Sequence, residues 1–208
     1  FYDENTAGRM LTAADLPALD GIDALFFGGI SLVVEPCAAA YEALCLAAAE
    51  TRPVMLDPNI RPGFITDEAT YRARLDRMIA AAGIVKLSDE DLRWLLGDGE
   101  IDVLAATLLA RGPRLVCVTR GAEGVTGYTA RGAVNVASEQ VTVVDTVGAG
   151  DTFNAGLLAQ LAADGVLTRE GIADLSDDML RAALSLGARA AAVTVSRAGA
   201  NPPWAREL

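Results

Sequence analysis

Residues 143–156 read VVDTVGAGDTFNAG, and this stretch decides the fold. Two valines lead into a run of small residues, and that run leads directly into a helical pattern, so we predict a strand, a tight turn and a helix. Small residues let a ligand come close to the backbone. The N–H groups of Gly148, Ala149 and Gly150 can then converge on an anion, and the helix dipole adds positive potential. The turn is therefore a candidate anion hole for a transferring phosphoryl group.

Asp151 follows the small residues and falls in the first turn of the helix. Aspartate is favoured there as a capping residue, so a structural role is the alternative to a chemical one. The chain contains no His, which removes Ser-His-Asp and Cys-His mechanisms. Two other phosphate motifs do not match, because the loop lacks the Lys-Ser/Thr pair of a P-loop and Phe153 replaces the third Gly of a dinucleotide fingerprint.

Upstream of this turn, short apolar runs alternate with longer helical patterns. Such alternation is typical of βαβ units and predicts an α/β protein with a mostly parallel, doubly wound sheet. The sequence after Gly124 becomes β-rich and predicts a hairpin at the sheet edge. The predicted strands are 24–30, 54–57, 84–87, 115–119, 125–129, 133–136 and 141–144, and the predicted helices are 36–50, 67–82, 89–96, 101–111, 149–163 and 178–195. No linker divides the chain, so we expect one domain over residues 1–208.

Composition narrows the class of protein. The 208 residues carry a net charge of −11, with 17 basic and 28 acidic residues, which argues against nucleic acid as a partner. No apolar run approaches the length of a membrane span, so no membrane partner is expected either.

Three cysteines, Cys37, Cys45 and Cys117, lie in apolar stretches without metal-binding spacing, which indicates buried thiols and a cytoplasmic location. The chain begins without Met, and we expect it to be a fragment or a processed product.

Residues 145–158, DTVGAGDTFNAGLL, closely resemble the C-terminal signature of the ribokinase-like (pfkB) carbohydrate kinases. The resemblance implies a ribokinase-like three-layer α/β/α sandwich and ATP-dependent phosphorylation of a hydroxyl group. It puts Asp151 in the place of the catalytic base, next to the sugar substrate, and Gly148, Ala149 and Gly150 around the phosphoryl group. It further implies Mg²⁺, with a monovalent cation as an additional candidate.

The motif Asp57-Pro58-Asn59-Ile60-Arg61 is similar to the D-x-N-x-R strand end of the fructokinase and 2-keto-3-deoxygluconate kinase branch. In that branch the Arg lies near the transferred phosphate, which makes Arg61 a candidate catalytic residue. Taken alone, Asp57 and Arg61 could equally form a surface ion pair.

Ser88 and Asp91 match a second family motif, the magnesium-associated N-x-x-E, with Ser88 for Asn and Asp91 for Glu. The resemblance makes both residues candidates for the metal network. The alternative is a helix start rich in acidic residues.

Two further turns resemble nucleotide-binding parts of the family. The segment 119–124, TRGAEG, is similar to the T-x-G-x-x-G turn that lines the nucleotide, so Thr119, Gly121 and Gly124 are candidate ATP contacts. Alone it would be only a β-turn. Ala200 belongs to a small-residue turn that resembles the one behind the adenine, although the helix before it lacks the Asn that relatives commonly carry.

The sugar-binding N-terminal third and the lid of such kinases have no counterpart in this sequence. Tyr2 resembles the aromatic residue that approaches the sugar, and an exposed chain end is the alternative. Asp3 stands where keto-acid kinases often show Arg, which favours a fructokinase-like enzyme for a neutral ketohexose over a 2-keto-3-deoxygluconate kinase. A catalytically incomplete nucleotide-binding fragment remains a third alternative, and a homodimer is a candidate assembly.

A nucleotide-binding regulatory module and a dinucleotide-dependent oxidoreductase are functions of other classes. The first would keep the anion hole and need no base, so Asp151 speaks against it. The second would need the glycine that Phe153 replaces.

Overall fold

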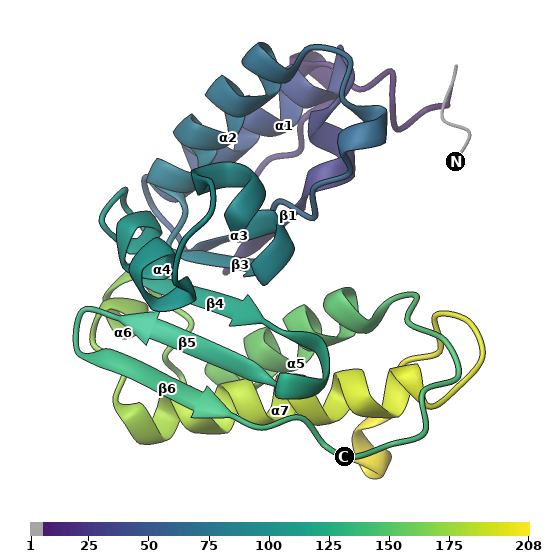
Figure 1. Cartoon of the computed structure of the whole chain (residues 1–208). Helices are drawn as coiled ribbons and strands as arrows, with labels where there is room; N and C mark the ends of the chain where they lie inside the picture. The colour runs from purple at the N-terminus through teal and green to yellow at the C-terminus, as the bar shows by residue number, and fades with distance from the viewer. Residues whose placement is uncertain (1–5) are drawn as a thin grey trace. The chain divides into compact units, whose positions relative to one another are not determined.

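The computed structural model describes residues 6–208. The chain divides into two compact units, Phe1–Val116 and Cys117–Leu208. Figure 1 draws both units and labels most of their helices and strands. That the two units belong to a single domain stays a prediction.

The first unit is built on parallel strands. Strand β1 (Leu25–Gly28) pairs with β2 (Val54–Asp57), and β2 pairs with β3 (Ile84–Ser88), all in parallel. Every residue of β2 is buried, because a strand inside a parallel sheet is covered on both faces. The parallel direction brings the carboxyl ends of β1, β2 and β3 to one edge. Residues 57–61 and 88–91 therefore follow neighbouring strands at that edge.

Four α-helices belong to the first unit, and two of them begin at side-chain caps that the sequence encodes. Asp67 accepts a hydrogen bond from Thr70 N–H at the start of α2, and Ser88 with Asp91 forms a capping box on α3. Helices α1 and α2 pack on each other and on the strands. The helices are α1 (Cys37–Ala49), α2 (Glu68–Ala81), α3 (Asp89–Leu96) and α4 (Ile101–Leu109), with single 3₁₀ turns at Ala13–Asp15, Gly29–Leu32 and Pro62–Phe64.

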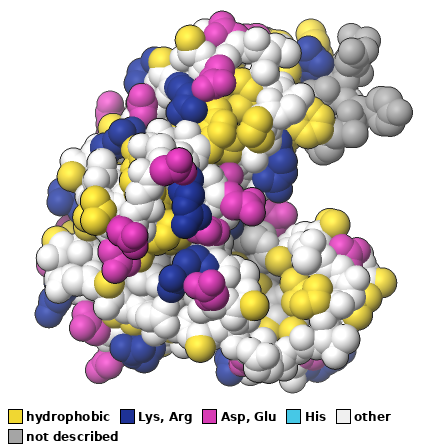
Figure 2. Space-filling view, in the orientation of Figure 1, with side chains coloured by type: hydrophobic (Ala, Val, Ile, Leu, Met, Phe, Trp, Pro, Cys, Tyr) yellow, Lys and Arg dark blue, Asp and Glu magenta, His cyan; other side chains and the backbone are white. Residues whose placement is uncertain are grey.

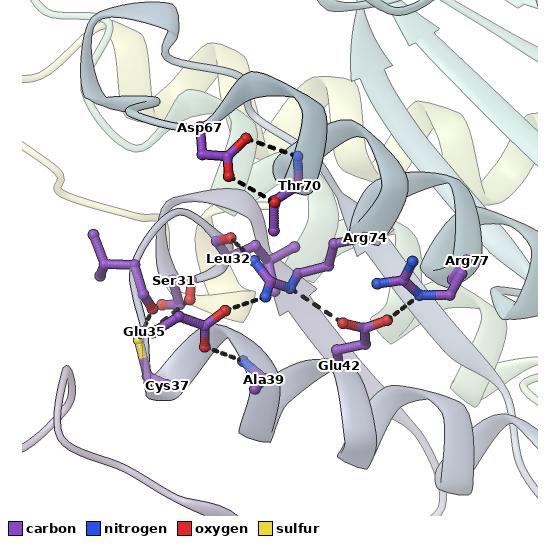
Figure 3. Close-up of polar contacts among 11 residues, drawn as sticks. Ser31, Leu32, Glu35, Cys37, Ala39, Glu42, Asp67, Thr70, Arg74 and Arg77 are labelled. Atoms are coloured by element: carbon purple, nitrogen blue, oxygen red, sulfur yellow. Dashed lines mark hydrogen bonds and ion pairs between the residues drawn. The ribbon is translucent and has the colours of Figure 1, made fainter.

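A buried arginine joins α1 and α2 (Figure 3). The Arg74 side chain is 6% exposed and donates to Leu32 O at 2.9 Å, to Glu42 at 3.2 Å and to Glu35. Arg77 adds a second cation beside Glu42. Each of the three guanidinium nitrogens therefore donates to an acceptor, as burial of a charge requires.

Replacing Arg74 with Met should lower the free energy of unfolding by about 3 kcal/mol, because the partly buried carboxylate of Glu42 and the carbonyl of Leu32 lose a partner. Urea unfolding followed by circular dichroism measures the change. As a control, Arg111→Met breaks only the exposed pair with Asp76 and should cost under about 0.5 kcal/mol. Equal costs for the two variants would contradict this reading of the buried cluster.

The second unit places two long helices against a hairpin. Strand β4 (Leu115–Thr119) crosses the unit boundary and precedes β5 (Val125–Thr129) and β6 (Gly132–Val136), which form the predicted antiparallel hairpin. Helix α7 packs on both hairpin strands and along α5, as Figure 1 shows. The helices are α5 (Ala149–Ala163), α6 (Arg169–Ala173) and α7 (Asp177–Val195), with 3₁₀ turns at Gly121–Glu123 and Ala205–Glu207.

Two differences from the sequence predictions lie in this unit. The prediction of a strand at 141–144 is wrong, because this segment is an extended loop with exposed valines. Its backbone bonds to the end of a helix instead of a strand, since Val144 N–H donates to Val195 O at 2.7 Å. The short helix α6 was not predicted, and it is capped by Thr168.

Small residues let α5 and α7 approach closely. A Cβ on Gly156 would lie 2.8 Å from Gly187 Cα, and one on Gly187 would meet the Phe153 ring at 2.9 Å. The two helix backbones are therefore in contact at this crossing. The start of α5 and the end of α7 are held at fixed relative positions, which matters for the site described below.

Several composition-based expectations concern the whole chain. Cys37, Cys45 and Cys117 are buried thiols outside any disulfide, as predicted, and burial raises the pKa of the Cys45 thiol to about 12. None of the helices in residues 6–208 has the length and apolar character that a membrane crossing requires. Acidic and basic side chains are interspersed on the face in Figure 2.

Candidate active site

The predicted phosphate turn precedes α5 in the second unit. Gly148 has a φ of 81°, a left-handed conformation that favours glycine, and α5 begins at Ala149. Thr152 donates to Gly148 O through its N–H at 2.9 Å and through its hydroxyl at 2.7 Å. Its hydroxyl also accepts from Thr194 of α7 at 3.1 Å. The turn is thereby fixed to both helices.

The N–H groups of this turn are only partly available for an anion. Ala149 N–H donates to Thr146 O at 3.3 Å, a long bond that closes the turn internally. The first N–H groups of an α-helix have no acceptor within the helix, so Gly150 and Asp151 contribute to the positive helix end. Convergence of all three predicted N–H groups on one anion stays a prediction.

The Asp145 carboxylate connects this turn to the segment around Gly199. One carboxylate oxygen accepts from Val147 N–H at 3.0 Å, and the other accepts from Gly199 N–H at 3.0 Å. These hydrogen bonds lower the pKa of Asp145. A Cβ on Gly148 would lie 3.0 Å from the Ala200 side chain, so the turn and Ala200 are neighbours.

A cavity of about 440 Å³ adjoins the turn inside the second unit. Ala149 and Gly150 line it on one side, and Thr119, Gly121 and Gly124 line it from the carboxyl end of β4. The structure thus brings the signature turn and the T-x-G-x-x-G turn into one cavity, at the strand edge where ligands of α/β sheets bind. Its apolar wall is made of Phe153, Ala188, Ala191, Ala192 and Val195.

Asp151 is exposed and does not line this cavity, although it directly follows Gly150, which does. Neither a hydrogen bond nor an ion pair of its carboxylate holds it as a structural cap within residues 6–208, and no side-chain cap bond is made at the α5 start. The role of Asp151 as the catalytic base stays a prediction.

The predicted residues of the first unit lie in a second cluster. Arg61 is exposed, and its guanidinium donates to Ile60 O at 2.9 Å. Asp91 is buried and accepts from Ser88 N–H at 3.3 Å and Ile60 N–H at 3.0 Å. Burial raises the pKa of Asp91, and its hydrogen bonds act in the opposite direction.

Asp57 at the end of β2 and the N-terminal residues Tyr2 and Asp3 were also singled out in the sequence. The ion pair between Asp57 and Arg61 that the sequence left open is not formed, because Asp57 pairs with Lys86 at 3.0 Å. Tyr2, the candidate sugar contact, lies outside the described residues, and so does Asp3.

Sequence reasoning assigned no role to Asp145, Thr152 or Lys86. Asp145 is the first residue of the signature motif. Its side chain accepts from the N–H two residues later, which is an Asx turn, and such turns are local features that a sequence can indicate. Thr194, which donates to Thr152, and Asp57, which pairs with Lys86, are distant in sequence from these residues, and no local signal indicates either contact.

Known carbohydrate kinases are similar to this chain in sequence. The family model described as "pfkB family carbohydrate kinase" matches residues 2–206. A fructokinase of Rhizobium leguminosarum bv. trifolii is 56% identical over 87% of this chain and 56% of its own length. A fructokinase of Salmonella thompson is 37% identical over 81% of this chain and 77% of its own length.

Solved structures are similar in the same way. A fructokinase from Vibrio cholerae O395, with fructose, ADP and calcium bound, has a TM-score of 0.81 and 26% identity over 94% of this chain and 61% of its own. An aminoimidazole riboside kinase from Salmonella enterica has a TM-score of 0.79 and 27% identity over 91% of this chain and 61% of its own.

The chain belongs to the pfkB family of carbohydrate kinases, and the predicted ribokinase-like α/β fold is confirmed. The chain spans a little over half the length of the Rhizobium leguminosarum fructokinase.

Replacing Asp145 with Asn should destabilise the second unit in a pH-dependent way. Because hydrogen bonds lower the folded-state pKa, the carboxylate's stabilising effect is complete above the unfolded aspartate pKa of about 3.9. The effect is lost as pH falls through the lower folded pKa. Urea unfolding midpoints should therefore differ most between the two proteins near pH 7, and the difference should shrink as the pH falls below the unfolded pKa of about 3.9. A difference that stays constant over this range would contradict the prediction.

Proposed function

We propose that the protein containing this chain is an ATP-dependent, fructokinase-like sugar kinase. The observation that carries the proposal is the cavity of about 440 Å³ that the signature turn and the turn at 119–124 line together. Its size suits a nucleotide. The curated fructokinases that the chain resembles support the choice of sugar class.

The apolar wall of the cavity supports a site for the adenine. Ala188, Ala191 and Ala192 of α7 leave space for a flat ring, and Phe153 closes the wall. Phosphates would then extend toward Ala149 and Gly150, where the positive end of α5 favours negative charge. A chain with a net charge of −11 needs such local positive potential to bind ATP.

The chemical step follows from Asp151. Its carboxylate takes the proton of the sugar hydroxyl while the hydroxyl oxygen attacks the γ-phosphorus in line, and ADP leaves with the electrons of the broken P–O bond. The N–H groups at the α5 start stabilise charge on the transferred phosphoryl group. Arg61 is proposed to meet the same charge, on the strength of its motif.

Mg²⁺ is the divalent ion we propose, with Ser88 and Asp91 acting on it through water. Within residues 6–208 no group of three or more acidic, Cys or His side chains could hold a metal ion. Both Asp91 oxygens accept backbone N–H groups, and Ser88 Oγ accepts Asp91 N–H. This donor set fits an ion that is bound mainly by ATP phosphates, as Mg²⁺ usually is, and that neutralises phosphate charge. A monovalent cation remains a further proposal.

Two alternatives are distinguished by one assay. A 2-keto-3-deoxygluconate kinase would phosphorylate the keto acid faster than fructose, and a catalytically incomplete fragment would bind ATP and phosphorylate neither. Coupled ADP-release assays with fructose and with 2-keto-3-deoxygluconate separate the three. We expect fructose to give the higher kcat/KM.

The decisive experiment replaces Asp151 with Asn, which keeps the shape and a capping oxygen and removes the basicity. Turnover of the protein containing this chain should fall by at least roughly 10²-fold, while the Kd for ATP changes little. Steady-state kinetics and calorimetric ATP titration measure the two quantities. Asp178→Asn, in the first turn of α7, is the matched control and should leave turnover unchanged. Near-normal turnover with a lower Tm would make Asp151 a cap only.

Arg61→Ala should lower kcat by at least about tenfold and leave the KM for ATP within about twofold, because the guanidinium is proposed to meet charge that develops in the transition state. Initial rates at varied ATP measure both constants. An unchanged kcat would reduce Arg61 to a structural residue.

A further inference from the structure

Lys86 is the only lysine of the chain, and it is buried. The other 16 basic residues are all arginines. Lys86 lies on β3, its side chain is 8% exposed, and its ammonium group is 3.0 Å from Asp57 Oδ2 at the end of β2. Sequence analysis gave it no role.

A buried charge is costly unless it is paired and hydrogen-bonded, so an isolated Lys86 would destabilise the fold. Asp57, whose side chain is 4% exposed, supplies the opposite charge. The pair joins the last residue of β2 to the middle of the neighbouring strand β3. Its location indicates that the ion pair acts on the turn that follows β2.

The Asp57 carboxylate also contacts the turn that follows β2. Its second oxygen accepts from Asn59 N–H at 3.2 Å. Asn59 has a φ of 40°, a left-handed conformation that asparagine adopts more readily than most residues. The carboxylate that Lys86 orients therefore holds the one non-glycine residue with positive φ in residues 6–208.

Asp91 holds the same turn one residue later. Its Oδ1 accepts from Ile60 N–H at 3.0 Å, and the Ile60 side chain is buried. Two carboxylates from neighbouring segments thus fix consecutive N–H groups immediately before Arg61. The turn has little freedom left to adjust if one of them moves.

We propose that Lys86 is a positioning residue for Arg61. The ammonium group orients the Asp57 carboxylate, and this carboxylate fixes the backbone of Asn59. The fixed turn then holds the Arg61 guanidinium where it can meet charge on the transferred phosphoryl group. The inference rests on the proposed role of Arg61 in phosphoryl transfer and adds a residue that itself touches no substrate.

A double-mutant cycle tests it, with Lys86→Met, Arg61→Ala and the double variant in the protein containing this chain. Lys86→Met should lower kcat about tenfold or more, because small displacements of a catalytic group have large effects on rate, and should leave the KM for ATP within about twofold. In the Arg61→Ala background the same change should lower kcat less than about twofold, since Lys86 acts through Arg61. Rates are compared well below the Tm of each variant.

Arg74→Met controls for the loss of a buried cation. It removes another buried, ion-paired residue of the same unit and should lower the Tm without changing kcat at these temperatures. If Lys86→Met does not fold, Lys86→Met with Asp57→Asn replaces it in the cycle, because this pair leaves no uncompensated buried charge.

The outcomes separate the inference from the proposed function. Equal loss of kcat on Lys86→Met in both backgrounds, or no loss in either, would overturn the inference while leaving the role of Arg61 intact. An unchanged kcat for Arg61→Ala would instead remove the proposed role of Arg61, and the inference with it. Strong loss only when Arg61 is present supports the proposal.

Discussion

Carboxylates that accept backbone N–H groups hold the functional turns of both units. A turn at the end of a buried strand exposes N–H groups that neither a helix nor a sheet satisfies, and leaving them unpaired would be costly. The acidic excess of the chain supplies the acceptors. Asp57 and Asp91 accept from the turn after β2, and Asp145 accepts from the turn before α5 and from the C-terminal segment.

This use of acidic residues explains how a chain of net charge −11 can belong to a family that binds ATP. The structural carboxylates face backbone N–H groups or a buried cation, as Asp57 faces Lys86, so their charge is locally compensated. Asp151 differs, since it is exposed at the positive end of α5. Among these four aspartates it is the one that is exposed, and its role as the base stays a prediction.

Periodic patterns predicted most elements, and the reasons are local. Residues 54–57 are apolar up to the final Asp and bounded by Pro53 and Pro58, and the structure buries all four in β2. The segment 141–144 has equally strong β propensity, but its N–H groups bond to the end of α7 rather than to a strand. Propensity describes what a segment can form, and the available partner decides what it forms.

The sequence by itself determined the family, most of the elements and the candidate residues Asp151, Thr119 and Arg61, because small-residue turns and charged residues at fixed spacing are local features. Only the tertiary structure decided that Asp57 pairs with Lys86 rather than Arg61, that Asp91 accepts from Ile60, and that Asp145 reaches Gly199. These contacts join residues 29, 31 and 54 positions apart. Which distant groups meet depends on how strands and helices pack, and no local pattern encodes that.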